Sequence, residues 1–169
     1  MIVLQTERLR LRHMTPDDAA FMLAMLNDPA WQRYIGDRGI RTVEGAREHI
    51  VKGPMAMVAR LGFGFYAVEL KEGSLPIGIC GLAKRDFLDD VDIGYAFLPA
   101  YGRKGYALEA AQATLAHARE LGLTRLVATV VPENAASIRL LEKLGLCFER
   151  TFQAPDSTRD LQLFGMTLA

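Results

Sequence analysis

Residues 92–121 read DIGYAFLPAYGRKGYALEAAQATLAHAREL, and this stretch decides the fold. Its first seven residues form an apolar run typical of a strand, and residues 106–121 have an alanine-rich pattern typical of a helix. The loop between them carries glycines and basic residues. Because the first N–H groups of a helix lack partners and the helix dipole is positive there, this order predicts an anion-binding site.

The composition of the loop predicts that the bound anion is a phosphate or a pyrophosphate. Gly102 and Gly105 allow the backbone to approach a ligand closely, while Arg103 and Lys104 add full positive charges. A plain tight turn would explain the glycines but not the charges beside them. The sequence therefore predicts that residues 102–107 bind phosphate groups.

Length and charge limit the remaining interpretations. The 169 residues suffice for a sizeable core, and we expect one domain over residues 1–169. Lys and Arg total 20 and Asp and Glu total 20, and this zero net charge argues against a dedicated nucleic-acid binder. No apolar run approaches the ~20 residues that span a bilayer, and the amino terminus lacks a signal-peptide pattern. We therefore expect a cytoplasmic protein with no membrane partner.

The two cysteines, Cys80 and Cys147, both lie in apolar, strand-like runs. This setting is typical of a buried reduced thiol. No group of Cys and His residues has the spacing of zinc ligands, so we predict no metal.

Periodicity predicts a mixed α/β (α+β) protein. Residues 7–12 alternate charge with leucine, as in a half-buried strand, and Thr15-Pro16-Asp17-Asp18 is a strong helix start. The expected strands are 7–12, 65–70, 75–84, 91–98, 125–131, 147–152 and 159–168, and the expected helices are 15–26, 42–60, 106–121 and 134–144.

Four motifs in succession add a family resemblance. They are Asp92-Ile-Gly-Tyr, Gly105-Tyr-Ala-x-Glu-Ala, Pro132-Glu-Asn-x-x-Ser and Glu142-Lys-x-Gly. This succession resembles the GNAT acyl-CoA N-acyltransferases, most closely the RimJ/RimL branch of ribosomal-protein N-terminal acetyltransferases. The opening TERLRLR of residues 6–12 and the CFER of residues 147–150 also resemble that branch. The resemblance covers nearly the whole chain.

The resemblance implies a GNAT-type fold and a place for the cofactor. The central sheet would be mixed, mostly antiparallel, with about seven strands flanked by helices, and it would splay between its fourth and fifth strands. Acetyl-CoA would lie in that cleft. The backbone of Phe97 and Leu98 would contact the pantetheine of acetyl-CoA. Asn134 would hydrogen-bond the cofactor arm beyond the fifth strand, and Ser137 would lie near the cofactor sulfur. The pyrophosphate would bind Gly102, Arg103, Lys104, Gly105, Tyr106 and Ala107.

The resemblance also suggests catalytic residues. Asp92, at the start of the fourth strand, is similar in place to a catalytic glutamate of the family, and it would act as general base through a water. Its alternative is a strand-edge carboxylate that is solvated or paired with an arginine. Many relatives have a tyrosine as general acid where this chain has Leu141, which leaves Ser137 as the nearest hydroxyl. Ser137 could equally bond the helix backbone.

The acceptor pocket would be walled by the connection between the first two helices and by the final hairpin. Trp31, Tyr34 and Arg38 are candidate lining residues, since aromatic and charged groups make an amphipathic wall. The alternative is that the two aromatic residues are ordinary packing.

The resemblance implies an acetyl-CoA-dependent N-acetyltransferase that acts by direct attack in a ternary complex. The acceptor would be a primary amine, either a protein N-terminal α-amine or a small-molecule amine. A covalent route is not expected, because neither cysteine has the His and acid partners of a nucleophile. A non-catalytic acyl-CoA-binding regulatory module is the alternative. Homodimers are common in the family.

Overall fold

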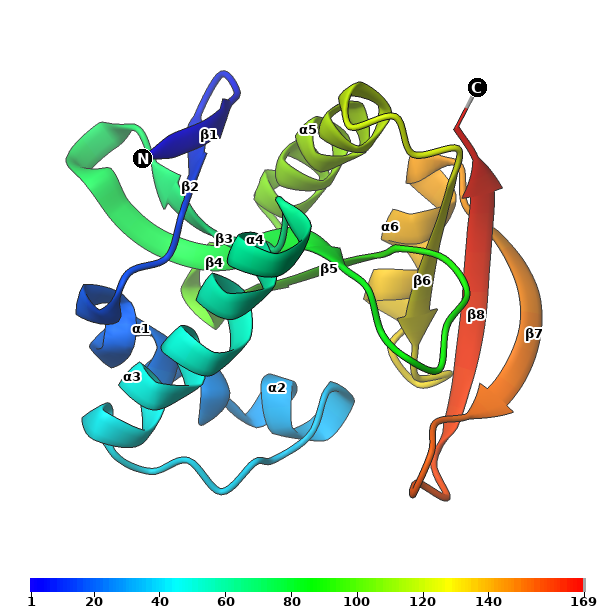
Figure 1. The fold of residues 1–169 in the computed structure, drawn as a ribbon, viewed down its shortest axis with the longest axis horizontal. Coiled ribbons are helices and arrows are strands. Elements are labelled where there is room, and N and C mark those ends of the chain that lie inside the picture. The colour runs from blue at the N-terminus through cyan, green and yellow to red at the C-terminus, as the bar shows by residue number, and fades with distance from the viewer. Residues whose placement is uncertain (169) are drawn as a thin grey trace.

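The computed structural model describes residues 1–168, and eight of its segments form one sheet in the order β1-β2-β3-β4-β5-β6-β8-β7 (Figure 1). All neighbouring strands are antiparallel except β5 and β6, which are parallel. The strands are β1 Ile2–Gln5, β2 Leu9–Arg12, β3 Phe65–Leu70, β4 Leu75–Ala83, β5 Asp92–Phe97, β6 Arg125–Val130, β7 Cys147–Gln153 and β8 Asp160–Thr167.

Helices cover both faces of the sheet. One face receives α5 and α6, which bury Leu115 and Leu141 against β6 and β8. The opposite face receives α1 and α3, which bury Met22 and Ile50 against β3 and β4. The helices are α1 Ala19–Leu26, α2 Pro29–Tyr34, α3 Val43–Ile50, α4 Ala56–Leu61, α5 Tyr106–Glu120 and α6 Ala135–Leu144. Figure 1 shows α1 and α3 at the left and α6 beside β6 at the right.

The mixed, mostly antiparallel sheet was predicted, and it has eight strands where about seven were expected. The unexpected strand is β1, which is only four residues long and pairs with β2 at the edge of the sheet. Its apolar residues do not alternate with polar ones, so it carries no period-two signal. The expected strand 7–12 begins only at Leu9.

A second helix was missed between Asn27 and Thr42. The first expected helix ends at residue 26, and Pro29 is the first residue of the next helix, α2. The Asp28 side chain caps this helix by accepting hydrogen bonds from the N–H groups of Ala30 and Trp31. Proline is favoured at that position, because its missing N–H would have had no partner there.

The expected helix 42–60 is continuous but not uniform. It consists of α3, a π-helical turn over Val51–Met55 and α4. Pro54 lies within the π-helical turn. Because proline has no N–H to donate, the regular hydrogen-bond pattern is interrupted there.

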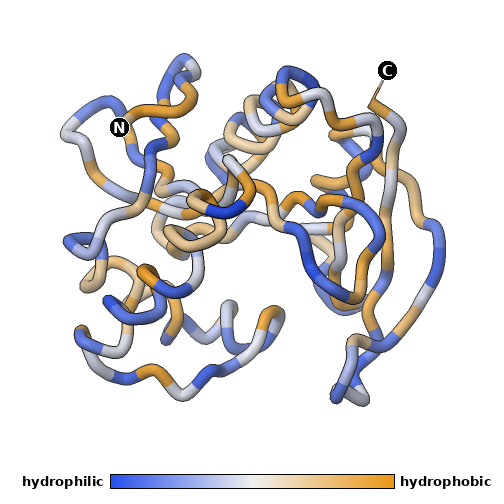
Figure 2. The backbone as a smooth tube through the Cα atoms, viewed as in Figure 1, coloured by the Kyte–Doolittle hydropathy of each residue, from blue (hydrophilic) through white to orange (hydrophobic). Residues whose placement is uncertain are grey.

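Hydropathy follows burial along the chain. Figure 2 shows apolar residues along much of the central strands and hydrophilic residues in the outer turns. Cys80 is buried and its sulfur lies 3.2 Å from the hydroxyl oxygen of Thr114, as expected for a packed thiol. Cys147 is exposed, so the expectation of burial was wrong there. It begins β7, which is the other edge strand and is exposed along most of its length.

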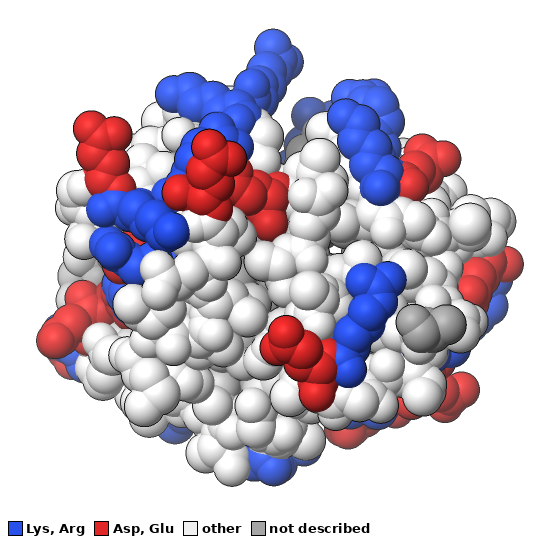
Figure 3. All heavy atoms as spheres, turned by 90° about the horizontal axis from the view of Figure 1, so that it is seen from above, with Lys and Arg blue, Asp and Glu red and all other residues white. Residues whose placement is uncertain are grey.

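Charged side chains of both signs lie on the face in Figure 3, and neither sign covers it. This mixture agrees with the formal net charge of zero. No helix formed by residues 1–168 has the length and apolar character needed to cross a membrane.

Candidate active site

The sheet opens between β5 and β6, which are the fourth and fifth of the strands expected from sequence. Within residues 1–168 these strands are in register at a single pair, Asp92 opposite Val127. The Val127 N–H donates to the Val91 carbonyl at 3.0 Å, which closes the strands at their amino ends. Beyond this pair the two strands are no longer in register, and the region between their carboxyl ends is where the cofactor cleft is expected.

That loop leaves backbone donors free. Gly105 has a φ of 82°, a left-handed conformation that glycine adopts without steric cost, and it caps α5. Within residues 1–168, the N–H groups of residues 103–108 have no backbone acceptor. Gly102 has an ordinary φ of −71°, whereas Arg103 has a φ of 61°. The loop therefore presents several N–H groups at the positive end of a 15-residue helix.

Residues far away in the sequence brace this loop. The Arg8 guanidinium donates from Nε to Glu109 Oε1 at 2.8 Å and from Nη1 to the Lys104 carbonyl at 3.0 Å. It also lies 4.3 Å from the ring centroid of Tyr106. Thr6 and the Arg8 backbone N–H donate to the other Glu109 oxygen. The sequence analysis missed Arg8, which lies 101 positions before Glu109 in the chain.

Asp92 lies at the closed end of the cleft and is almost fully buried, with 2% of its surface exposed. Its Oδ2 accepts a hydrogen bond from Arg85 Nε at 3.2 Å, and its Oδ1 has no hydrogen-bond partner in the described chain. Burial raises the pKa of Asp92 above its ordinary value, although Arg85 acts in the opposite direction. Asp92 is thus paired with an arginine, which was one of the alternatives considered from the sequence. Its other carboxylate oxygen is still able to accept a proton.

Ser137 lies across the cleft in the first turn of α6. Its hydroxyl is 2.8 Å from the phenol oxygen of Tyr95 on β5, and that phenol also donates to the Ser137 carbonyl at 3.3 Å. The Ser137 hydroxyl therefore bonds the opposite strand and not its own helix. Burial raises the pKa of the Tyr95 phenol, so it stays neutral at physiological pH. Tyr95 belongs to a quoted motif, but nothing local in the sequence indicated this contact.

Asn134 begins the same helix. Its side-chain oxygen accepts a hydrogen bond from the Ser137 N–H at 3.2 Å, so it caps α6. Leu141, at the position of the family tyrosine, is 1% exposed and lies in the core among α5, α6 and β6. No hydroxyl can therefore come from that position.

Phe97 and Leu98 differ in what their backbones can offer. The Leu98 N–H donates to the Ile77 carbonyl at 2.9 Å, and its carbonyl accepts from the Tyr101 N–H at 3.0 Å. Because alternate residues of a strand direct their N–H groups to opposite sides, the Phe97 N–H faces the open side of β5. Phe97 is thus the better placed of the two for a ligand in the cleft.

The three candidate acceptor residues have different surroundings. Trp31 is partly buried against the core formed by α1 and α3, which agrees with ordinary packing. The guanidinium carbon of Arg33 lies 5.0 Å from the ring centroid of Tyr34. Arg38 is exposed and lines a hollow against α3 that neither aromatic residue shares. Arg159 of the turn between β7 and β8 does donate to the Arg33 carbonyl, so α2 and the final hairpin touch as expected.

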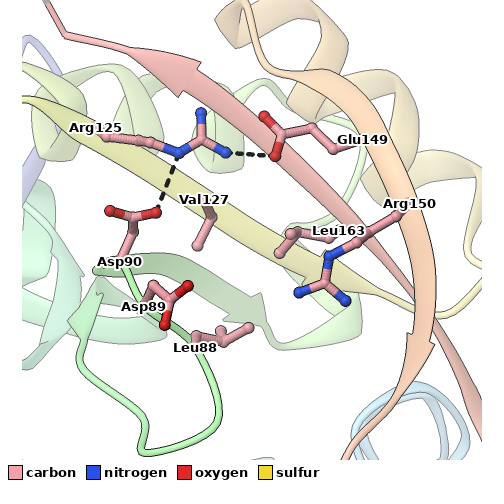
Figure 4. A pocket seen from close by; sticks show the side chains of 8 residues that line it. All are labelled: Leu88, Asp89, Asp90, Arg125, Val127, Glu149, Arg150 and Leu163. Atoms are coloured by element: carbon pink, nitrogen blue, oxygen red, sulfur yellow. Dashed lines mark hydrogen bonds and ion pairs between the residues drawn. The ribbon is translucent and has the colours of Figure 1, made fainter.

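A hollow lies over β6 and β8 beneath the loop between β4 and β5 (Figure 4). Its floor is apolar and its rim is charged. Arg125 on β6 joins the rim by pairing with Asp90 of the loop at 3.1 Å and with Glu149 of β7. The floor includes Val127, the register partner of Asp92. The lining residues are Leu88, Asp89, Asp90, Arg125, Val127, Glu149, Arg150 and Leu163.

The described residues contain no group of three or more His, Cys, Asp or Glu side chains that could hold a metal ion. Burial raises the pKa of the Cys80 thiol to about 12. This thiol is therefore protonated at neutral pH and unsuited to nucleophilic attack.

Comparisons with known proteins agree with this geometry. A family model described as an acetyltransferase (GNAT) domain matches residues 8–146. The uncharacterized N-acetyltransferase YnaD of Bacillus subtilis is 32% identical over 149 residues, which are 88% of this chain and 84% of YnaD. A GNAT-family acetyltransferase from Bacillus anthracis superposes with a TM-score of 0.81 at 30% identity, covering 99% of this chain and 98% of that chain.

The RimL ribosomal L7/L12 α-N-protein acetyltransferase, solved in complex with coenzyme A, superposes with a TM-score of 0.85. It is 18% identical, and the match covers 99% of this chain and 98% of RimL. At that identity the likeness concerns the fold alone. The fold, the family model and the relatives define an N-acetyltransferase. The chain belongs to the GNAT family of acetyltransferases.

Proposed function

We propose that this protein transfers an acetyl group from acetyl-CoA to a primary amine by direct attack in a ternary complex. The proposal is carried by one observation: β5 and β6 diverge from a buried carboxylate toward a loop of free N–H groups. The carboxylate at one end could accept the proton of the acceptor amine, and the N–H groups at the other end could bind the phosphate groups of acetyl-CoA.

The loop fits the phosphate groups of the donor. Residues 103–108 offer unpaired N–H groups, and Arg103 and Lys104 are exposed beside them. Phe97 turns its N–H toward the open side of β5, and Asn134 borders the cleft on the side of α6. When bound, acetyl-CoA supplies a thioester carbonyl for attack and a thiolate as leaving group.

Asp92 is the proposed general base. Neutralising a lysine side chain at pH 7 costs about 4.6 kcal/mol, whereas an α-amine costs about 1.4 kcal/mol. Oδ1 of Asp92 has no partner, and its raised pKa brings it closer to that of the amine it would deprotonate. Because Asp92 is buried, proton transfer would pass through a water.

Ser137 is the proposed proton donor to the leaving thiolate. A thiol has a pKa of about 8.5, so a weak acid suffices. The phenol has one hydrogen, and when it turns from the Ser137 carbonyl to the serine hydroxyl oxygen, the serine hydroxyl hydrogen is free to point into the cleft. Tyr95 is in this way a positioning residue for Ser137.

A thiol-release assay with acetyl-CoA and a panel of amines tests the proposal. The panel holds peptides with free α-amines, free amino acids, polyamines and peptides whose only amine is a lysine side chain. We expect release of CoA that requires an amine, with α-amines and other weakly basic amines favoured. Acetyl-CoA binding without release for any amine would instead support the regulatory module.

A further inference from the structure

Arg8 carries unused hydrogen-bonding capacity at the phosphate loop. Its Nε and Nη1 have protein acceptors, but Nη2 has none within residues 1–168. A Cβ atom built on Gly105 would lie 3.3 Å from this nitrogen. The free edge of the guanidinium therefore lies beside Gly105, which caps α5 and lies within the row of N–H groups that lack a backbone acceptor.

The free edge is held in place before any ligand binds. Two ion-pair and hydrogen-bond contacts and the Tyr106 ring fix the guanidinium, although the side chain is 41% exposed. An arginine normally loses much rotamer freedom when it binds a ligand. Here that loss has already occurred, so a contact from Nη2 would add affinity at little entropic cost.

The nearby carboxylate does not cancel this effect. Glu109, in the first turn of α5, would repel an anion if its charge were free. Burial alone would raise its pKa, but hydrogen bonds from Thr6 and Arg8 and the charge of Arg8 outweigh burial and lower it. Both Glu109 oxygens accept hydrogen bonds from Thr6 and Arg8, so the carboxylate holds the arginine, and 19% of the Glu109 side chain is exposed.

We propose that Arg8, from the turn between β1 and β2, binds the diphosphate of acetyl-CoA directly through its free Nη2 edge. The inference rests on the proposed function, because it needs acetyl-CoA in the cleft. It gives the amino-terminal turn a role in cofactor binding that the loop sequence alone did not indicate. The guanidinium complements the exposed Arg103 and Lys104, which make no ion pair in the described chain.

Calorimetric titration with CoA of the wild type and of Arg8→Gln tests the contact. We expect the Kd for CoA to rise about tenfold or more, since hydrogen bonds between charged groups are the strong ones. The matched control is Arg10→Gln, which also removes one positive charge and lies two residues further along the chain. The Arg10 side chain donates to Glu69 and Ser74 and not to the phosphate loop. An equal loss in both variants would show a general charge effect and overturn the inference.

Glu109→Gln separates a direct contact from a brace. If Arg8 touches the diphosphate, Glu109→Gln keeps an oxygen that can accept from Arg8 Nε and leaves the arginine in place, so it should weaken CoA binding much less than Arg8→Gln does. If Arg8 acts only by bracing the loop through Glu109, both variants weaken binding alike, which would overturn the direct contact. Thermal midpoints of all variants check that each is folded.

The donor itself supplies the last control. Acetyl-pantetheine lacks the diphosphate, so its kcat/KM should be the same in the wild type and in Arg8→Gln. An equal fall in kcat/KM with acetyl-CoA and with acetyl-pantetheine would show that Arg8 does not contact the diphosphate. Failure of the folded wild type to bind CoA would instead contradict the proposed function, whereas wild-type binding that Arg8→Gln leaves unchanged would contradict only the role of Arg8.

Discussion

Asp92 combines a buried position with one paired and one unpaired oxygen, and this combination is compatible with both of its interpretations, a partner of Arg85 and a general base. A structural partner of Arg85 would need only Oδ2. A general base needs an oxygen that is free to accept a proton, which Oδ1 supplies. The residue can serve both purposes at once.

Asp92→Asn should lower kcat/KM by about 100-fold or more, in the range found for general bases. The fall should be larger for amines of high pKa, which need more help to lose a proton. The base must be ionised, so activity of the wild type should rise with pH through the raised pKa of Asp92, and the variant should lack that rise. Rate measurements across pH with two amines check this, and an unchanged profile would assign Asp92 to structure alone.

The same substitution has a separate effect on stability. A carboxyl whose pKa is raised on folding binds its proton more tightly in the folded state, so its contribution to stability falls as pH rises above the unfolded pKa. At pH 7 Asp92→Asn should therefore be no less stable than the wild type. Urea midpoints at pH 7 measure this, and a clearly lower midpoint for the variant would mean that the pair with Arg85 outweighs the burial of charge.

Tyr95 and Ser137 form a pair whose effects should not add. Ser137→Ala should lower kcat by roughly 10- to 100-fold, at the weak end for an acid because thiolate leaves readily. Tyr95→Phe should lower kcat by a similar factor, with little change in the KM for acetyl-CoA, and the double variant should be no worse than either alone. Steady-state kinetics of the three variants test the pairing, and fully additive losses would show that the two hydroxyls act independently.

At the scale of elements, α6 shows how one residue can have two uses. The Asn134 oxygen caps the helix, while its amide nitrogen has no partner in the described chain. Asn134→Ala should destabilise the protein by about 1 kcal/mol through loss of the cap. Asn134→Asp keeps a capping oxygen but removes the amide donor. If Asn134 also contacts the cofactor, the aspartate variant should keep the urea midpoint and lose affinity for CoA, and unchanged affinity would leave only the cap.

Most elements could be predicted because their patterns are local. The strand before the phosphate loop and α5 after it carry long runs of consistent periodicity, and the glycines mark where they end. β1 and α2 were missed because the first is a four-residue edge strand and the second begins where the first helix ends. Cys147 was misjudged because an apolar run does not show which strands lie at an edge.

The candidate site was predictable only in part for a related reason. The loop of residues 102–107 is continuous in sequence, so its glycines and charges could be seen together. The contacts of Arg8 with Glu109 and of Tyr95 with Ser137 join residues 101 and 42 positions apart. No local pattern encodes such pairs, because only the path of the chain through the sheet brings them together.

At the scale of the whole molecule, the sheet consists of two parts that meet at the closed end of the cleft. β1 to β5 form one part and β6 to β8 the other, joined in register at Asp92 and Val127 and bridged by Tyr95 and Ser137. A ligand between the parts should stabilise the protein. CoA at 100 times its Kd should add about 2.7 kcal/mol, or roughly 5–10 °C in Tm for a chain of this size. Thermal scans over a range of CoA concentrations measure the shift, and a constant Tm would argue against binding in the cleft.

The central claim is that the cleft beside the phosphate loop binds acetyl-CoA, and calorimetry tests it most directly. The comparison is between the wild type and Gly105→Trp, which places a bulky side chain at a left-handed position beside the free N–H groups. We predict micromolar binding to the wild type that is lost in the variant, with both proteins folded by circular dichroism. No binding to the folded wild type, or equal binding to both proteins, would contradict the account.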